Sequence, residues 1–405
     1  MEITLNYRNK TLEGEVLLPA SKSISNRVLI IEALAGGKYA VENLAMCDDT
    51  RSMVEALHSD NNRLDIGHAG TSMRFLTAYL SLIAGRWELT GSERMKQRPI
   101  GVLVEALNRL GAHIEYREKE GYPPLVIYGT SLTGGEIEIP ASVSSQYISA
   151  LMMIAPYMKN GLTIRLTGKI VSGSYLDMTM QLMRYFGVNA EREEAVIRIP
   201  PGNYIPRPFR VEPDWSAASY FYECLAIAGK GAIELKGLSR DSMQGDSRQA
   251  RVWEQLGVIT RFTDEGVVLT PGPRLTTRLE EDFIEMPDLV QSFAVACCMM
   301  DLPFVFRGID TLRIKETDRV EALKNELAKM GFILEERTGE NALAWEGHRE
   351  NVVKVPHIST YNDHRMAMSF APAALKFPKI VISDKEVVNK SFPGYWEEID
   401  RLFMS

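Results

Sequence analysis

Ser21-Lys22-Ser23-Ile24-Ser25-Asn26-Arg27 is the stretch around which the rest of the chain is organised. It follows Pro19 and precedes an apolar run from Val28 to Ala35, so it predicts the start of a helix capped by one of its serines. Two cations at a helix N-terminus meet the positive end of the helix dipole, and a bound anion would reverse that cost. The stretch therefore indicates either a capped surface helix with incidental cations or one side of an anion site.

Length and composition favour a protein of two or more domains. The chain has 405 residues, of which 45% are hydrophobic, and single cores stop growing at about 250–300 residues. A net charge of −7 argues against a nucleic-acid or anionic-membrane partner. The N-terminus has no signal-peptide pattern, and no apolar run approaches the roughly 18–20 residues that span a bilayer. We therefore expect a soluble, cytoplasmic protein.

The cysteines and histidines lack the spacing of a metal site. Cys47, Cys224, Cys297 and Cys298 form no C-x-x-C pair, and the six histidines form no H-x-x-x-H pair. We interpret the cysteines as reduced core residues in a reducing compartment. No structural zinc is expected.

Four predicted helices end in the same way, at a glycine that follows an apolar residue. They are 103–110 before Gly111, 178–186 before Gly187, 250–256 before Gly257, and 320–330 before Gly331. Glycine just past a helix commonly takes the left-handed conformation that closes it. The interval of 70 to 76 residues between these glycines indicates an internal repeat.

Each repeat also contains a more apolar helix, and in every repeat but the first a predicted strand follows that helix. The apolar helices are predicted at 23–35, 71–84, 145–158, 216–228, 289–300 and 365–376, and the strands at 87–90, 162–166, 232–235, 304–306 and 380–382. Helices that are apolar on all sides should be buried, which places the sheets outside them. The chain thus reads as six units, the first shorter than the others by about 25 residues. A proline-rich segment from Pro200 to Pro208 separates three units from three.

The polar and charged residues recur at two places in each repeat. One place is the start of the apolar helix: Lys22-Ser23, Gly70-Thr71-Ser72, Ser144-Ser145-Gln146, Asp214-Trp215-Ser216, Pro287-Asp288 and Asn362-Asp363-His364-Arg365. The other is the loop predicted before the amphipathic helix: Asp48 to Arg51, Arg94 to Pro99, Ser172 to Tyr175, Ser239 to Arg248, Arg313 to Arg319 and Lys390 to Pro393. Taken singly, these are explained by helix capping or by surface ion pairs. Taken together, buried helices with polar N-termini could aim several dipoles at one polyanion.

Six of these motifs closely resemble those of the 5-enolpyruvylshikimate-3-phosphate synthase family of enolpyruvyl transferases. They are Ser21 to Arg27, Ala69 to Arg74, Arg94 to Gly101, Ser144 to Gln146, Leu312 to Arg319 and Tyr361 to Met368. The resemblance runs from about Leu18 to Trp396. It implies an α/β fold, the two-domain inside-out α/β barrel with six βαβαββ repeats, three per domain, of which the first is shortened here.

The resemblance also implies where the domains lie and what they bind. Residues 21–212 would form an N-terminal domain that mainly binds shikimate 3-phosphate. Residues 1–20 and 213–405 would form a C-terminal domain that mainly binds phosphoenolpyruvate, with the active site in the cleft between the two.

The reaction implied is transfer of the enolpyruvyl group of phosphoenolpyruvate to the 5-hydroxyl of shikimate 3-phosphate, with release of phosphate, in the shikimate pathway. It proceeds by addition and elimination, and the resemblance implies no metal, no cofactor and a monomer. A sugar-nucleotide enolpyruvyl transferase would typically carry a reactive cysteine in the loop that corresponds to 94–98, and this chain has none there. A non-catalytic paralogue that binds the same ligands is the other alternative.

The resemblance also implies which residues form the site, one motif at a time. Shikimate 3-phosphate would be bound by Lys22, Ser23, Arg27, Ser144, Ser145, Gln146, Ser172, Tyr175, Asp288 and Lys315. Phosphoenolpyruvate would be bound by Lys22, Gly70, Arg98, Gln146, Arg319, Arg365 and Lys390. The catalytic candidates are Asp288 as the base for the 5-hydroxyl, Glu316 for proton transfer at the methylene carbon, and Lys22 as an acid–base partner of the departing groups.

Three positions depart from the family pattern. His68 stands where asparagine is usual, Phe75 where proline or leucine is usual, and Thr311 where an asparagine often contacts substrate. The first repeat also lacks a segment between Ser59 and Gly67. His68 is the departure nearest to the residues that would position phosphoenolpyruvate, whereas Gly70 favours ordinary sensitivity to the inhibitor glyphosate.

Overall fold

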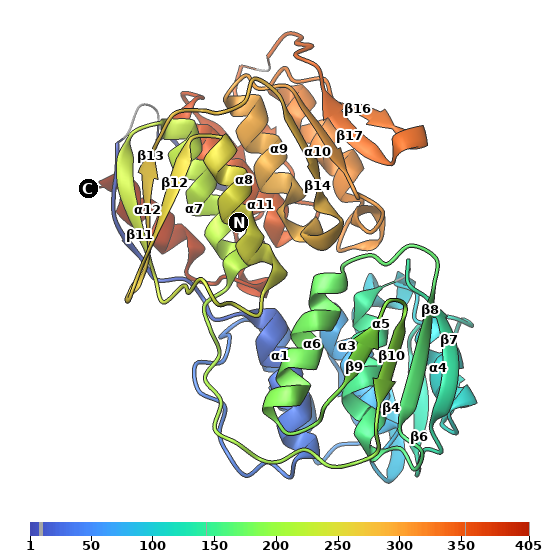
Figure 1. Cartoon of the computed structure of the whole chain (residues 1–405). Helices are drawn as coiled ribbons and strands as arrows, with labels where there is room; N and C mark the ends of the chain where they lie inside the picture. The colour runs from blue at the N-terminus through green and yellow to red at the C-terminus, as the bar shows by residue number, and fades with distance from the viewer. Residues whose placement is uncertain (8–10, 143, 353, 405) are drawn as a thin grey trace. The chain divides into compact units, whose positions relative to one another are not determined.

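The chain divides into two compact units in the computed structural model, which describes residues 1–7, 11–142, 144–352 and 354–404 (Figure 1). One, the middle unit, comprises residues 20–211, and the other, the terminal unit, comprises residues 1–19 and 212–405. Both crossings between the units lie one residue earlier than the sequence analysis placed them. The beginning of the chain thus belongs with its C-terminal half.

Four four-stranded sheets share one strand order. In each sheet the first strand of the repeat runs parallel to the second, and the last two strands add on antiparallel. In the middle unit the sheets are β3 (Arg63–Asp65), β4 (Gly85–Thr90), β6 (Leu125–Gly129) and β5 (His113–Tyr116), and β7 (Gly135–Pro140), β8 (Leu162–Thr167), β10 (Val196–Ile199) and β9 (Glu191–Glu193). In the terminal unit they are β2 (Leu12–Val16), β11 (Gly231–Lys236), β13 (Gly266–Pro271) and β12 (Val258–Thr263), and β14 (Leu279–Asp282), β15 (Phe304–Arg307), β17 (Ala342–Trp345) and β16 (Glu335–Arg337).

A fifth sheet has three strands, and its edge comes from the start of the chain. β18 (His357–Ile358) runs parallel to β19 (Ile380–Ile382), and β1 (Ile3–Leu5) pairs antiparallel with the other edge of β19. Because β2 likewise opens the sheet of β11, the first residues of the chain complete two sheets of the terminal unit. In the first repeat, the described residues show only an isolated bridge between Glu42 and Arg210 where a sheet stands in the others.

The apolar helices form the buried centre of each unit. They are α1 (Lys22–Leu34), α3 (Gly70–Leu80) and α5 (Ser145–Ile154) in the middle unit, and α7 (Trp215–Ala228), α9 (Val290–Met299) and α11 (His364–Phe370) in the terminal unit. Every residue of α9 and α11 is buried. In the terminal unit these three helices pack against one another with the sheets around them (Figure 1), which confirms that the apolar helices are internal.

The amphipathic helices lie next in each repeat, and four of them end at the predicted glycines. They are α2 (Asp48–Leu57), α4 (Gly101–Arg109), α6 (Gly173–Tyr185), α8 (Gln249–Gln255), α10 (Arg319–Lys329) and α12 (Tyr395–Met404). The four glycines beyond α4, α6, α8 and α10 have φ between 85° and 105°. Such a backbone conformation penalises side chains that carry a Cβ, so the repeated glycine marks the end of each helix for a steric reason.

Several helix boundaries differ from the sequence prediction. α5 and α11 stop at Ile154 and Phe370 and continue as short 3-10 turns, because Pro156 and Pro372 lack the N–H that an α-helix would use. α3 stops at Leu80 instead of residue 84. The stretches 48–51 and 173–175, predicted as loops, are the first turns of α2 and α6.

The predicted serine cap of the first helix is not made. Ser21 occupies the position before α1, but its side chain makes no capping hydrogen bond. The Ser25 hydroxyl instead accepts a bond from the backbone N–H of Ala45 at 3.0 Å. The N–H groups at the start of α1 therefore keep no serine partner from the capping position.

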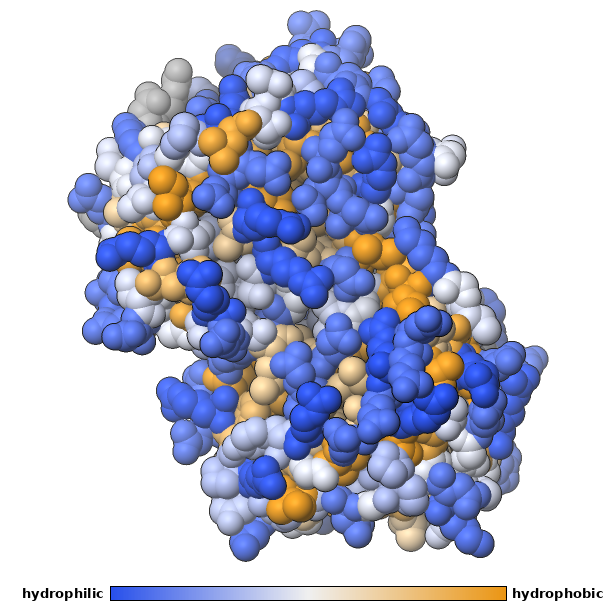
Figure 2. Space-filling view, in the orientation of Figure 1, coloured by the Kyte–Doolittle hydropathy of each residue, from blue (hydrophilic) through white to orange (hydrophobic). Residues whose placement is uncertain are grey.

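All four cysteines are free and buried, as predicted. Among the described residues, no helix has the length and apolar content that crossing a bilayer requires. The face drawn in Figure 2 is mostly hydrophilic, with separate hydrophobic spots.

Candidate functional site

Arg27 is a buried cation whose hydrogen-bond partners are all neutral. Its Nε donates to Thr179 Oγ1 at 2.8 Å, and its two Nη atoms donate to the Ser23 carbonyl at 2.8 Å and to Ser149 Oγ at 3.2 Å. The guanidinium lies 5.3 Å from the ring centre of Phe75 and 5.7 Å from that of Tyr175. Burial lowers the pKa of Arg27 to about 10. Such a group is prepared for a planar anion, because the anion would supply the missing charge.

Lys22 lies one turn before Arg27 and pairs with an acid. Its Nζ is 2.9 Å from Asp49 Oδ2, and the Asp49 side chain is almost wholly buried. Asp49 stands in the first turn of α2, where the N-terminal N–H groups favour a carboxylate. The pair holds the lysine ammonium near the start of α1.

Gly70 lies directly against the guanidinium of Arg98. A Cβ added at Gly70 would lie 2.5 Å from Arg98 Nη1 and 2.9 Å from both Cζ and Nη2. Arg98 is itself buried, and its Nε finds no partner among the described residues. Arg74 ties the two segments together, because its Nη atoms donate to the carbonyls of Gly70 at 3.2 Å and of Pro99, the residue after Arg98, at 2.9 Å.

The remaining predicted site residues of the middle unit lie at the starts of α5 and α6. Ser144 caps α5 by accepting the Gln146 N–H at 3.3 Å, and Gln146 Nε2 donates to Thr71 Oγ1 at 3.2 Å. Ser172 precedes α6 with a left-handed φ of 58°, a conformation that costs energy in a serine. Tyr175, in the first turn of α6, stacks on Arg27. Ser145 begins α5 and is half-buried.

Arg319 is the centre of the charged cluster in the terminal unit. It is 1% exposed, and its three guanidinium nitrogens reach three carboxylates: Nε donates to Asp363 at 2.8 Å, Nη1 to Asp288 at 2.9 Å, and Nη2 to Glu316 at 3.0 Å. Burial alone would lower the pKa of Arg319, but these three carboxylates together raise it. A fully buried arginine with three acids is a rigid support for the groups around it.

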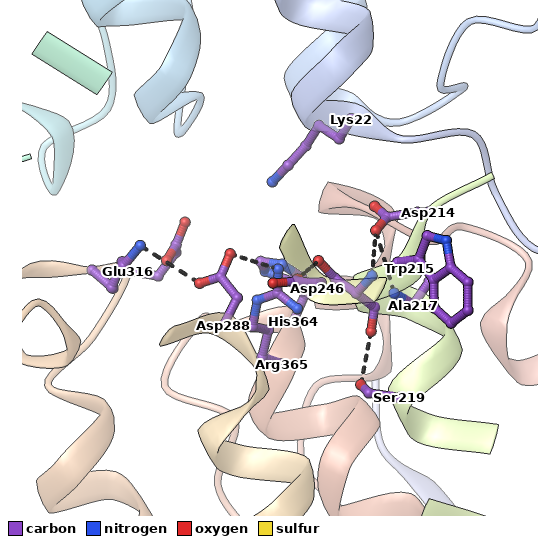
Figure 3. Close-up of polar contacts among 12 residues, drawn as sticks. Lys22, Asp214, Trp215, Ala217, Ser219, Asp246, Asp288, Glu316, His364 and Arg365 are labelled. Carbon is purple, nitrogen blue, oxygen red and sulfur yellow. Dashed lines mark hydrogen bonds and ion pairs between the residues drawn. The ribbon is translucent and has the colours of Figure 1, made fainter. Parts of the chain in front are cut away.

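Asp288 is held by three cations. Its Oδ2 accepts a bond from Arg365 Nη2 at 2.8 Å, and its Oδ1 lies 2.9 Å from Arg319 Nη1 and 3.5 Å from Lys315 Nζ. Figure 3 shows Asp288 and Arg365 directed toward one another from separate segments. Burial would raise the pKa of Asp288, but Arg365, Lys315 and Arg319 outweigh it and lower the pKa well below its usual range. With these three cations around it, Asp288 is an ionised carboxylate and a weak base.

Glu316 bridges two of the cations. Its Oε2 meets Arg319 Nη2 at 3.0 Å, and its Oε1 lies 3.8 Å from Lys390 Nζ. Lys390 ends the 3-10 turn Lys385–Lys390 and is buried. Burial lowers the pKa of Lys315, and the neighbouring Asp288 opposes that shift. The four cations of this cluster thus face three carboxylates, Asp288, Glu316 and Asp363, at close range.

Asp246 adds a further acid beside this cluster. It lies in the 3-10 turn Gly245–Arg248, is 4% exposed, and accepts a hydrogen bond from Ser216 at the start of α7. Burial, followed by the charge of Asp288, raises the pKa of Asp246 to about 7. Asp214 caps the same helix by accepting from Ser216 N at 2.8 Å and from Ala217 N (Figure 3). A carboxyl that titrates near neutrality beside ion-paired acids is a functional-site signal.

The departures from the family pattern have definite locations. His68 is exposed, and its Nδ1 lies 2.9 Å from Ser92 Oγ. Phe75 packs beneath Arg27. Thr311 is 6% exposed, and its hydroxyl has no hydrogen-bond partner among the described residues.

The structure gathers the predicted residues into two sets, one in each unit. The middle unit holds Lys22, Ser23, Arg27, Gly70, Arg98, Ser144, Ser145, Gln146, Ser172 and Tyr175, and the terminal unit holds Asp288, Lys315, Glu316, Arg319, Arg365 and Lys390. The sequence analysis missed their close partners Asp49, Ser149, Thr179, Tyr220, Asp246 and Asp363 as site residues. Asp49, Asp246 and Asp363 carried a usable signal, since each lies in one of the recurring polar stretches noted in the sequence. In the part of the chain that is described, no group of three or more His, Cys, Asp or Glu side chains is arranged to hold a metal ion.

Comparisons with known proteins all give one family. The profile described as "EPSP synthase (3-phosphoshikimate 1-carboxyvinyltransferase)" matches residues 7–59 and 57–399. A Bacteroides fragilis protein named 3-phosphoshikimate 1-carboxyvinyltransferase is 52% identical over 389 residues, which cover 96% of this chain and 95% of that protein. A protein of the same name from Salmonella heidelberg is 38% identical over 96% of each chain.

Solved structures agree at the level of the fold. The structure of EPSP synthase from Acinetobacter baumannii superimposes with a TM-score of 0.76 and covers 99% of this chain and 98% of its own. Its sequence identity is 22%, so this likeness shows the mixed α/β fold and no more.

Proposed function

The chain belongs to the EPSP synthase (3-phosphoshikimate 1-carboxyvinyltransferase) family, and from this premise we propose that it transfers the enolpyruvyl group of phosphoenolpyruvate to the 5-hydroxyl of shikimate 3-phosphate. The family match across residues 7–399 carries the proposal. The abundance of buried cations in both units supports it, because the two substrates together present two phosphates and two carboxylates.

The chemistry divides into an addition and an elimination. In the addition, the 5-hydroxyl oxygen bonds to C2 of phosphoenolpyruvate, the hydroxyl proton goes to a base, and the methylene carbon takes a proton. In the elimination, the C2–O bond to phosphate breaks, phosphate departs, and the methyl carbon returns a proton as the double bond re-forms. The protein must therefore supply proton donors and acceptors at two atoms and hold four anionic groups.

We assign the binding groups of the middle unit mainly to shikimate 3-phosphate. Arg27 would hold the carboxylate with Ser23, since its guanidinium lacks an acidic partner among its hydrogen bonds. The serines at the starts of α5 and α6 would hold the phosphate with Lys315, and Gln146 and Tyr175 would contact the ring. Lys22, Gly70 and Arg98 would face the phosphate of phosphoenolpyruvate together with Lys390.

In the terminal unit, Arg319 and Arg365 would hold the carboxylate of phosphoenolpyruvate. Binding that carboxylate would compete with Asp288, which both arginines contact in the structure. Substrate anions would thereby relieve the charge pairing that lowers the pKa of Asp288, and Asp288 would become basic enough for the 5-hydroxyl when the hydroxyl is present. Glu316 would exchange the proton at the methylene carbon, and Lys22 would assist the departing groups.

The fold part of the proposal is the inside-out α/β barrel. The repeated strand order and the internal helices support six βαβαββ units, with α1 and α2 forming the shortened first unit. A cytoplasmic location, a monomeric state and glyphosate sensitivity stay predictions from the sequence.

Phosphate release is the direct test. We expect release that requires both phosphoenolpyruvate and shikimate 3-phosphate and needs no added metal or nucleotide. Release at full rate without shikimate 3-phosphate would contradict the proposed acceptor. Binding of both substrates without any turnover would favour the non-catalytic alternative.

A further inference from the structure

We propose that Glu326 is a positioning residue for the phosphoenolpyruvate side of the site, acting through the segment from Ser359 to Asp363. It lies on α10, two turns beyond Arg319. The inference rests on the proposed function for its kinetic consequences, and on contacts within the terminal unit for its structural basis.

Glu326 is a fully buried carboxylate whose two oxygens are both used. Oε1 accepts a hydrogen bond from the Tyr361 hydroxyl at 2.7 Å. Oε2 accepts from the Ser359 N–H at 2.9 Å and from Lys329 Nζ at 2.6 Å. Lys329 also donates to the His357 carbonyl at 2.9 Å. A buried charge is costly unless it is paired and hydrogen-bonded. The contacts of Glu326 and Lys329 therefore fix the backbone and side chains of the segment from His357 to Tyr361.

The segment that Glu326 holds has an unusual backbone. Tyr361 and Asn362 have φ values of 55° and 56°, both in the left-handed region. Asparagine tolerates this region, whereas tyrosine does not readily adopt it. Such conformations persist where the surroundings over-determine them. The hydroxyl bond from Tyr361 to Glu326 supplies that constraint at the strained residue itself.

The strained pair leads directly into the charged cluster. Asp363 follows it, caps α11 by accepting the Arg365 N–H at 2.9 Å, and binds Arg319 through both of its oxygens. Arg319 and Glu326 stand seven residues apart, a spacing that puts them on the same face of a helix. Helix α10 therefore holds this segment through two residues, Arg319 and Glu326. Loss of the Glu326 contacts would allow Asp363 to shift relative to Arg319 and Arg365.

The decisive variant is Glu326→Gln. It replaces one carboxylate oxygen by an amide NH2 group, so the side chain keeps a single acceptor oxygen and the ammonium of Lys329 loses its negatively charged partner. We expect the KM for phosphoenolpyruvate to rise about tenfold, in line with the loss of one hydrogen bond to a charged group, while the KM for shikimate 3-phosphate changes less than threefold. Tyr361→Phe removes one bond and should shift the same KM in the same direction by a smaller factor.

Glu321→Gln is the matched control, because Glu321 lies on the same helix, is half exposed and pairs with Lys324. It should leave both KM values unchanged. Hydrogen exchange gives a readout that does not depend on activity: in Glu326→Gln, but not in the control, amides of residues 359–366 should exchange faster.

The outcomes separate cleanly. A lower unfolding temperature with an unchanged KM for phosphoenolpyruvate and unchanged exchange at 359–366 would overturn the inference and leave Glu326 a stabilising residue only. Equal increases in both KM values would likewise overturn it. If wild-type protein shows no turnover, the proposed function fails, and the exchange measurement alone then decides whether Glu326 holds the segment.

Discussion

Replacing Gly70 by alanine tests how closely the phosphoenolpyruvate site is packed. The new Cβ would lie 2.5 Å from Arg98 Nη1, whereas ordinary contacts begin near 3.4 Å. The guanidinium must therefore move by roughly 1 Å. Because the obstacle is the end of a flexible side chain and Gly70 is helical, we expect a stability change below about 1 kcal/mol.

The displaced guanidinium should cost affinity for phosphoenolpyruvate. A charge-assisted hydrogen bond contributes about 1.5–3 kcal/mol, so the KM for phosphoenolpyruvate should rise between about ten- and a hundredfold, with the KM for shikimate 3-phosphate nearly constant. The assay is steady-state phosphate release at saturating shikimate 3-phosphate. Gly202→Ala is the control, since a Cβ there meets nothing within 4 Å.

A double-mutant cycle decides whether the effect passes through Arg98. If it does, adding Gly70→Ala to an Arg98→Ala protein should change the KM for phosphoenolpyruvate little further. Full additivity of the two substitutions, or an unchanged KM in the single variant, would refute the reasoning.

Three further substitutions probe the charged groups. Glu316→Gln should retain binding of both substrates, measured by calorimetry, and lose turnover; unchanged turnover would remove Glu316 from proton transfer. Arg27→Met should raise the KM for shikimate 3-phosphate by about a hundredfold or more. It should not lower the free energy of unfolding in urea, because it removes a buried charge whose hydrogen-bond partners are neutral. A large loss of stability would count against this explanation. Asp246 has a folded-state pKa near 7, above its usual value of 3.8, so the folded protein holds an extra proton and loses stability as pH rises from about 4 to above 7. Asp246→Asn should remove this pH dependence, which amounts to at most ~4 kcal/mol over the range, and urea unfolding at several pH values measures it. Parallel pH profiles of the two proteins would show that Asp246 is ionised throughout.

The sequence pattern predicts the repeat because glycine has a steric role at each helix end. Gly111 and its three counterparts recur at a nearly fixed interval, and each has the positive φ that the pattern implies. The helix lengths were less predictable at Pro156 and Pro372, where a proline inside an apolar run ended the α-helix early. Hydrophobic periodicity does not record a missing N–H.

The charged side chains of the site could be predicted from motifs, but their partners could not. Thr179 contacts Arg27 across 152 positions of sequence, and Asp363 contacts Arg319 across 44. Glu326 stands in an ordinary amphipathic helix, where an acid reads as a solvent-exposed residue. Only the fold shows that it is buried beneath a strained segment, because burial depends on how elements distant in sequence pack.

The pairing of β1 with β19 constrains the order in which the two units can fold during synthesis. The ribosome delivers the first residues long before Ile380–Ile382, their partners in the sheet, and the same delay applies to β2 and β11. The middle unit contains its own strands and helices without interruption from 20 to 211, so it can become compact while the nascent chain still holds β1 and β2 unpaired. Completion of the sheet that contains β1 must wait until residues 380–382 have been synthesised, and until then the short strands β1 and β2 present unpaired edges.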